Sequence, residues 1–290
     1  MKRQVIAFLV VVSLIGCCLT GCRKKQEDVS SQTDWYEALE RLGDFTLRRM
    51  GAEAKEYGAD PEDYCIVKYT GAEETPAIPT RTEDGVPITA IGKWAFAGNE
   101  AVREVIIPDG CRAILSQAFY NCKNLTYVRL GADVSYVSEW ETFSACRAME
   151  KYEVSEENLY FYAEGNCLID RRVNGVVYGC GSSVIPDGIE RIGSCAFSEA
   201  GMQKEIRIPE SVKEIGFFAF YGSEISGIYL PKSVILMKDG AFSQCPGARI
   251  RCEAESQPVE WSGIWTDGAG SKYEPPAVEW DAHEKTEEKR

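Results

Sequence analysis

The feature that most constrains the fold of this 290-residue chain is a short motif that returns at nearly constant intervals. Ile91-Gly92-Lys93-Trp94-Ala95-Phe96 is followed by similar segments that each end in a phenylalanine. The phenylalanines of the motif are Phe96, Phe119, Phe143, Phe197, Phe220 and Phe242. Neighbours lie 23, 24, 23 and 22 residues apart, except for one interval of 54 residues after Phe143. A fixed period of this length indicates stacked units that each bury the apolar side of the next.

A second motif keeps phase with the first. An aliphatic residue and a proline stand before a repeat phenylalanine, and the proline precedes it by 11 residues, as in Ile107-Pro108 before Phe119. Leu125-x-x-Val128-x-Leu130 adds alternating apolar positions typical of a strand. Proline ends strand pairing because it has no N–H to donate. The two motifs together predict a β-rich solenoid of about 22–24-residue coils.

The Ile-Pro, Ile-Gly-x-x-Ala-Phe and Phe-x-x-Cys elements resemble the BspA-like leucine-rich-repeat family of bacterial surface proteins. The similarity spans residues 64–262 and implies a leucine-rich-repeat right-handed superhelix. Residues 158–178, in the long interval, predict a β-hairpin-like insertion that replaces a regular coil. Residues 263–290 are expected to form a C-terminal capping segment and a disordered tail.

The first residues predict export and a lipid anchor. Lys2 and Arg3 precede an apolar run of about fifteen residues, which is short for a spanning helix of roughly twenty. The run ends in Leu19-Thr20-Gly21-Cys22, which resembles a bacterial lipobox. This resemblance implies cleavage of a signal peptide, residues 1–21, and acylation of Cys22. The alternatives are an overlapping match that ends at Cys17, an uncleaved anchor and an ordinary secretory signal.

Residues 22–33 are polar and predict a tether. Over residues 34–63 we expect an N-terminal cap helix, because Asp34 and Glu37 have the spacing of a capping box and apolar residues follow at helical spacing. A helix that binds a partner is the alternative. The expected location is the outer face of a bacterial cell membrane, lipid-anchored and exposed at the cell surface.

The composition excludes several function classes. A formal charge of −13 argues against nucleic acid as a partner, because a phosphate-binding surface needs clustered basic residues. His283 is the only histidine, and no phosphate-binding loop is present. We therefore expect no enzyme, no cofactor and no metal site.

Nine of the twelve cysteines follow Cys22, and none of them forms a Cys-x-x-Cys pair. Cys122, Cys146 and Cys245 each stand three residues after a repeat phenylalanine. One interpretation is that they are buried structural thiols, which pack as small apolar side chains. The other is a Cys122–Cys146 cross-link between adjacent coils.

The outward positions of the predicted strands form a candidate binding face. Arginine and tyrosine are enriched at binding hot spots. The candidate residues at the central strand positions, which we expect to lie in one column together with Val184, are Arg129, Arg207, Tyr229 and Arg251, and Tyr127 is a candidate at the preceding outward position. They favour an acidic protein or a glycan as partner and an adhesion or binding module as function. A sheet face that is merely solvated, a structural cell-envelope lipoprotein and an accessory subunit of an enzyme complex are the alternatives.

Overall fold

The structure is a computed structural model that describes residues 39–201, 205–266 and 275–282. The predicted signal peptide, Cys22, the tether and the last eight residues lie outside these ranges. No helix among the described residues has the length and apolar character needed to cross a membrane.

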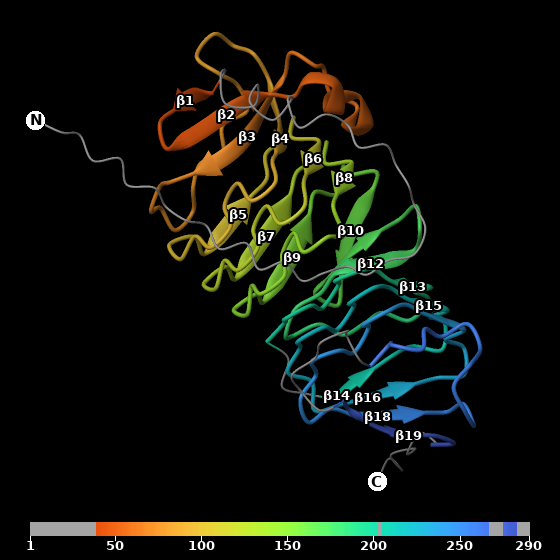
Figure 1. The fold of residues 1–290 in the computed structure, drawn as a ribbon. Coiled ribbons are helices and arrows are strands. Elements are labelled where there is room, and N and C mark those ends of the chain that lie inside the picture. The colour runs from red at the N-terminus through yellow and green to blue at the C-terminus, as the bar shows by residue number, and fades with distance from the viewer. Residues whose placement is uncertain (1–38, 202–204, 267–274, 283–290) are drawn as a thin grey trace, which may run out of the picture. The chain divides into compact units, whose positions relative to one another are not determined.

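Most coils contribute one strand to each of two rows (Figure 1). Row 1 contains β5 (Glu104–Ile106), β7 (Tyr127–Leu130), β9 (Lys151–Val154), β14 (Glu205–Arg207), β16 (Gly227–Leu230), β18 (Arg249–Cys252) and β19 (Ala277–Glu279). Row 2 contains β3 (Tyr64–Tyr69), β4 (Ile88–Ile91), β6 (Ala113–Ile114), β8 (Tyr136–Val137), β12 (Gly175–Tyr178), β13 (Arg191–Ile192), β15 (Glu214–Ile215) and β17 (Leu236–Met237). The parallel pairing of β7 with β9 and of β16 with β18 confirms the predicted solenoid.

Both rows are interrupted at the long interval of the repeat. Row 1 forms the sheets β5-β7-β9 and β14-β16-β18-β19, and row 2 likewise divides between β8 and β12. We call the coils around Phe96, Phe119 and Phe143 the N-terminal stack. The coils around Phe197, Phe220 and Phe242 form the C-terminal stack. The buried apolar residues correspondingly form two large clusters.

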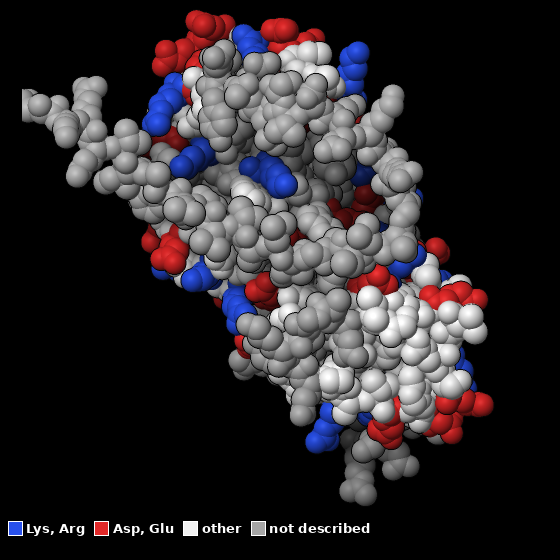
Figure 2. Space-filling model, viewed as in Figure 1, with Lys and Arg blue, Asp and Glu red and all other residues white. Residues whose placement is uncertain are grey.

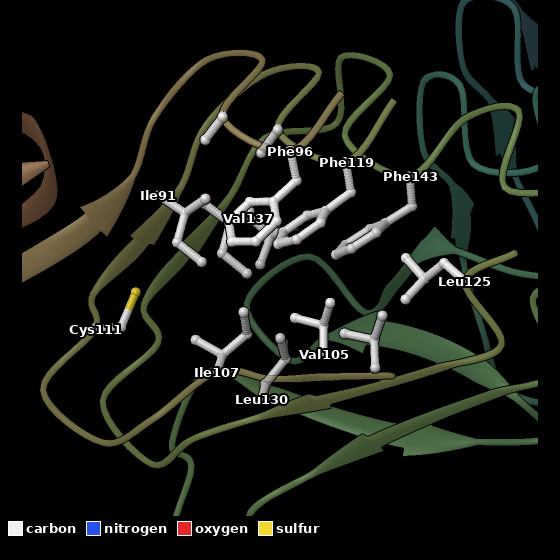
Figure 3. Packing of buried hydrophobic residues seen from close by; sticks show 14 of the residues in the cluster. Ile91, Phe96, Val105, Ile107, Cys111, Phe119, Leu125, Leu130, Val137 and Phe143 are labelled. Carbon is white, nitrogen blue, oxygen red and sulfur yellow. The ribbon is translucent and has the colours of Figure 1, made fainter. Parts of the chain in front are cut away.

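The repeat phenylalanines are stacked within each part. Ring centroids lie 4.8 Å apart for Phe96–Phe119, 5.3 Å for Phe119–Phe143, 5.0 Å for Phe197–Phe220 and 4.9 Å for Phe220–Phe242. Figure 3 shows three of these rings side by side, pointing toward the aliphatic residues of row 1 and the following turns. Stacking thus buries an aromatic file that no single coil could bury alone.

The turn around each repeat phenylalanine contains two left-handed residues. They stand two positions before and two positions after the ring, as at Gln117 (φ 59°) and Asn121 (φ 59°) around Phe119. The same two positions are left-handed around each of the remaining five repeat phenylalanines. Glycine occupies only some of them, such as Gly98 and Gly240. Most coils therefore adopt this turn at a steric cost that glycine would avoid.

The described cysteines are all free and buried. The thiols of Cys122 and Cys146 donate to the carbonyls of Phe96 and Phe119, each at 3.1 Å, and Cys245 donates to Phe220 at 3.0 Å. Each thiol thus satisfies a carbonyl of the preceding coil. The interpretation as structural thiols is confirmed, and Cys122 and Cys146 are not cross-linked.

The predicted N-terminal cap helix is wrong where the structure describes it. Residues 39–63 form the strands β1 (Glu40–Leu42) and β2 (Phe45–Arg49) and the 3₁₀ helix η3 (Gly51–Tyr57). Gly43, with φ 57°, turns the chain between the two strands. β2 pairs with β3, and burial of Phe45 and Leu47 follows the period of two of a strand. The apolar spacing read as helical leaves out Leu47, which alternates with Phe45 as in the strand that forms.

The predicted hairpin-like insertion is present. β10 (Phe161–Glu164) and β11 (Cys167–Asp170) are antiparallel and joined by Gly165-Asn166, both with φ 57°. β11 then pairs antiparallel with β12, which pairs parallel with β13 and so rejoins the solenoid. The ring of Tyr178 packs edge-on against Phe143, and its hydroxyl donates to the Ser138 carbonyl at 2.7 Å. Tyr178 thus packs where the next repeat ring would follow.

Candidate functional site

The candidate binding residues lie on row 1, but in two separate sheets. Arg129 stands in register between Ile106 and Glu153 in the N-terminal stack. Tyr229 stands in register between Arg207 and Arg251 in the C-terminal stack. The single column expected from the sequence is therefore wrong, because the β10–β11 insertion interrupts it. Val184, expected at a strand centre, is exposed and lies outside the strands.

In the N-terminal stack, Tyr127, Lys151 and Glu153 form one polar cluster. The Tyr127 hydroxyl donates to Glu153 at 2.5 Å, and the Lys151 ammonium forms an ion pair with the same carboxylate. Burial, and then the bond to Glu153, raises the pKa of Tyr127 to about 12. The hydrogen bonds from Lys151 and Tyr127 lower the pKa of Glu153. Glu153 is therefore a carboxylate at neutral pH, and Tyr127 is a neutral donor.

Arg129 is exposed beside this cluster. Within the described residues it forms no ion pair, and the neighbouring Ile106 is also exposed, at 42%. A guanidinium beside an apolar side chain and a tyrosine has the composition of a binding hot spot. Its positive charge adds to the lowering of the pKa of Glu153 by Lys151 and Tyr127, and the exposed guanidinium is accessible to a partner.

In the C-terminal stack, the arginines already pair within the chain. Arg251 forms an ion pair with Glu205, which lies two strands away across Gly227. A Cβ at Gly227 would touch Glu205 Cγ at 3.6 Å, so a larger side chain would fill the space that this pair uses. A guanidinium nitrogen of Arg207 lies 3.6 Å from a carboxylate oxygen of Asp187, so these residues also form an ion pair.

Tyr229 is buried, with 5% of its surface exposed, and the prediction that it lies on an open face is wrong. The two arginines that flank it in register belong to the neighbouring strands. The sequence pattern correctly places Tyr229 on row 1. It does not show how much of the Tyr229 side chain the side chains of the neighbouring strands cover. Tyr229 therefore supports this sheet and offers a partner little surface.

Comparison with protein families gives a direct match. Residues 84–168 and 178–250 match the family described as BspA type leucine rich repeat region, in six copies, and these ranges cover more than half of the chain. The chain belongs to the BspA-type leucine-rich-repeat family. None of the curated proteins matches it at a significant level.

Solved structures of similar fold come from several bacteria. A leucine rich cell surface protein of Faecalibacterium prausnitzii is 17% identical, with 85% of this chain and 96% of that chain covered and a TM-score of 0.36. A leucine-rich repeat protein of Eubacterium ventriosum is 16% identical, with 72% and 70% covered and a TM-score of 0.46. The T. pallidum leucine-rich repeat protein is 23% identical, with 70% and 81% covered and a TM-score of 0.37.

The BspA-type coils on the two sides of the insertion are joined by an ion pair that sequence reasoning missed. Glu139 accepts hydrogen bonds from Arg191, at 2.8 Å for one nitrogen, and from the Ser194 amide at 3.0 Å. Burial opposes ionisation of Glu139, but these bonds outweigh it and lower its pKa. Glu139 and Arg191 are 52 residues apart, on opposite sides of the insertion in the sequence. Their contact therefore becomes visible only when the three-dimensional course of the insertion is known.

The face of this BspA-type protein drawn in Figure 2 carries charges of both signs. In the view of Figure 2, Lys and Arg side chains are scattered among Asp and Glu side chains. Among the described residues, no three His, Cys, Asp or Glu side chains form a group that could hold a metal ion. The arrangement on row 1 therefore offers hydrogen bonds, one available charge and apolar contact to a partner.

Proposed function

We propose that this chain is a non-catalytic binding module, displayed on the outer face of a bacterial membrane through a lipid on Cys22. It binds an acidic protein or glycan through the outward face of β5, β7 and β9. The supporting observation is Arg129, which is exposed beside Ile106 and Tyr127 and forms no ion pair within the described residues. Family membership supports a binding scaffold, and the F. prausnitzii relative is named a cell surface protein.

The second candidate function is that of a structural cell-envelope lipoprotein or an accessory subunit of an enzyme complex. The observation that favours it is the internal pairing in the C-terminal stack, where Glu205 and Asp187 pair with Arg251 and Arg207. A sheet face whose charges pair with one another stays soluble without a partner.

The test compares binding of the full chain to an array of acidic glycans and acidic peptides. Arg129→Glu is expected to weaken capture by about tenfold, because one attractive charge becomes repulsive. Lys123→Glu is the matched control, since Lys123 is exposed outside row 1 and its loss changes the net charge equally. Unchanged capture by Arg129→Glu would contradict the proposed face and favour the second candidate.

The anchor is tested separately in cells. A lipid carrying an alkyne is expected to label the wild-type chain and not Cys22→Ala. Cys17→Ala is the control, because the overlapping motif ends there. Labelling that survives loss of Cys22 would contradict this anchor.

A further inference from the structure

At the insertion several strands lie at the end of their sheet, and two of them, β9 and β10, face one hollow. β9 is the last strand of the sheet β5-β7-β9, and β10 is the first strand of the sheet that continues through β11 and β12. Each pairs along one edge only, and no described strand pairs with the other edge. Elsewhere in row 1, inner strands such as β7 and β16 are paired on both edges. Unpaired edges are templates for a further strand.

The backbone of β9 alternates between its two edges. The amides of Lys151 and Ser155 donate to the carbonyls of Thr126 and Leu130, at 3.1 and 2.9 Å, on the side of β7. The alternation of a parallel ladder then directs the amides and carbonyls of Tyr152 and Val154 to the opposite edge. The amide and the carbonyl of both Tyr152 and Val154 are thus directed to this edge, where each residue offers one donor and one acceptor.

A hollow of about 400 Å³ lies along this edge. All four residues of β9 line it, and Tyr162, Ala163 and Glu164 of β10 form part of its wall. The volume lies in the range of about 300–1,000 Å³ that holds small ligands. A short extended segment is the occupant that could also use the free amides and carbonyls.

The charges around the hollow favour a basic occupant. Three carboxylates and two cations line the hollow, a formal charge of −1: Lys151 pairs with Glu153, and the Arg171 guanidinium, 4.6 Å from the centre of the Tyr162 ring, keeps its charge. Glu156 and Glu164 also line the hollow and form no ion pair within the described residues. Two carboxylates therefore remain for a lysine or arginine side chain of the occupant.

We propose that the hollow receives an extended, lysine- or arginine-containing peptide segment of a partner protein, which adds as a strand to the free edge of β9. Main-chain hydrogen bonds to Tyr152 and Val154 supply affinity, and Glu156 and Glu164 select the basic side chain. The hollow adjoins the outward face proposed above, because Lys151 and Glu153 also line it, but its main-chain contacts come from the sheet edge. Charged side chains surround the edge of β9, and they also limit edge-to-edge pairing between two copies of the chain.

The experiment measures binding of a fluorescein-labelled hexapeptide, alternating lysine and valine, to the full chain by fluorescence anisotropy. Amide hydrogen exchange is recorded with and without peptide. We expect saturable binding together with slower exchange at Tyr152 and Val154. The double variant Glu156→Lys/Glu164→Lys is expected to weaken binding by at least about tenfold, equivalent to about 1.4 kcal/mol.

Three controls make the outcome decisive. A hexapeptide N-methylated at alternate residues keeps the side chains but cannot complete the ladder, and it is expected not to bind. Glu104→Lys changes one exposed charge on β5 of the same sheet, away from the hollow, and is expected to bind as wild type. Arg129→Glu is expected to bind the hexapeptide at least as well as wild type, because it adds a negative charge beside Glu153 of the hollow, whereas the proposed function expects it to weaken capture of acidic ligands.

The proposal is overturned by either of two results. Equal binding of the N-methylated peptide would show that no strand is added. Binding without slower exchange at Tyr152 and Val154 would place the peptide elsewhere. Loss of acidic-ligand capture by Arg129→Glu bears only on the proposed function and leaves this inference standing.

Discussion

The two stacks have the same coil but differ in how neighbouring coils are linked three residues after the repeat phenylalanine. In the N-terminal stack, Asn99, Cys122 and Cys146 each donate to a carbonyl of the preceding coil. In the C-terminal stack, Ala200 has no side-chain donor, and Ser223 donates to Phe220 of its own coil at 2.6 Å. Of the three described residues at this position in the C-terminal stack, Cys245 donates to the preceding coil. The aromatic file is thus common to both stacks, whereas the polar link at this position is not.

The stacks also end differently. At the N-terminal end, Phe45 packs on Tyr69, which packs on Phe96, with centroid distances of 4.8 and 4.9 Å. At the C-terminal end, Trp265 packs edge-on against Phe242 at 5.9 Å. Both ends continue the file with another aromatic ring. Covering the exposed apolar face of a terminal coil is a requirement of solenoids, and unrelated side chains meet it here.

The largest expected effect comes from removing the central ring of either file. Phe119→Ala and Phe220→Ala each leave a cavity between two neighbouring rings, and each is expected to lower the free energy of unfolding by about 3–5 kcal/mol. Urea unfolding followed by circular dichroism measures the change. Phe217→Ala is the control, because Phe217 is exposed and its loss is expected to cost little. Losses near those of the control would show that the files do not stabilise the stacks.

The repeat made most of the fold predictable, because the two motifs recur with one period and each position has one role. The sequence predicted the stacked phenylalanines, the insertion and, except at Val184, the row 1 strands correctly. The residues before β3 were misread because Leu42, Phe45 and Met50 fit a helix, whereas Phe45 and Leu47 alternate as in the strand that forms.

The candidate site was less predictable, for a different physical reason. The repeat correctly assigns Tyr229 to row 1, but whether its neighbours cover it depends on side-chain conformations across three strands. The Glu205–Arg251 pair joins side chains two strands apart, and a pattern of apolar residues does not record which charged side chains meet. The break of the column depends on how the insertion folds. Only local periodicity can be read directly from the sequence.

A second expected effect, of intermediate size, tests whether the buried thiols of both stacks respond alike to pH. Burial raises the pKa of Cys111 and of Cys252 from 9.0 to about 12. Because the folded pKa is the higher one, the stabilisation is complete below pH 9 and is lost as the pH rises toward 12. The free energy of unfolding, measured in urea from pH 8 to pH 11, is expected to fall over this window.

Cys111→Ala and Cys252→Ala should each make that fall shallower, by up to about 1.4 kcal/mol per pH unit. Val234→Ala is the control, because it opens a buried site without removing a thiol. It should lower stability equally at every pH. If one cysteine variant keeps the wild-type slope, the two stacks do not share this response.

The smallest expected effect concerns the left-handed turn residues. Gln117 precedes the ring of the N-terminal stack and Gln244 follows the ring of the C-terminal stack, with φ 59° and 56°. Glycine relieves a steric cost of about 1–2 kcal/mol at such a position but loses about 0.5–1 kcal/mol of backbone entropy. Gln244→Gly is therefore expected to raise the free energy of unfolding by about 0.5 kcal/mol.

Gln117→Gly should gain less, because the Gln117 amide accepts from Trp94 and donates to Glu141 at 2.7 Å. Gly98→Ala is the reverse control: it places a Cβ at φ 71° with open space around it and should cost about 1 kcal/mol from backbone strain alone. A neutral Gly98→Ala would refute the steric argument. Equal gains in the free energy of unfolding at Gln117 and Gln244 would instead show that the side-chain hydrogen bonds of Gln117 to Trp94 and Glu141 do not stabilise the N-terminal stack.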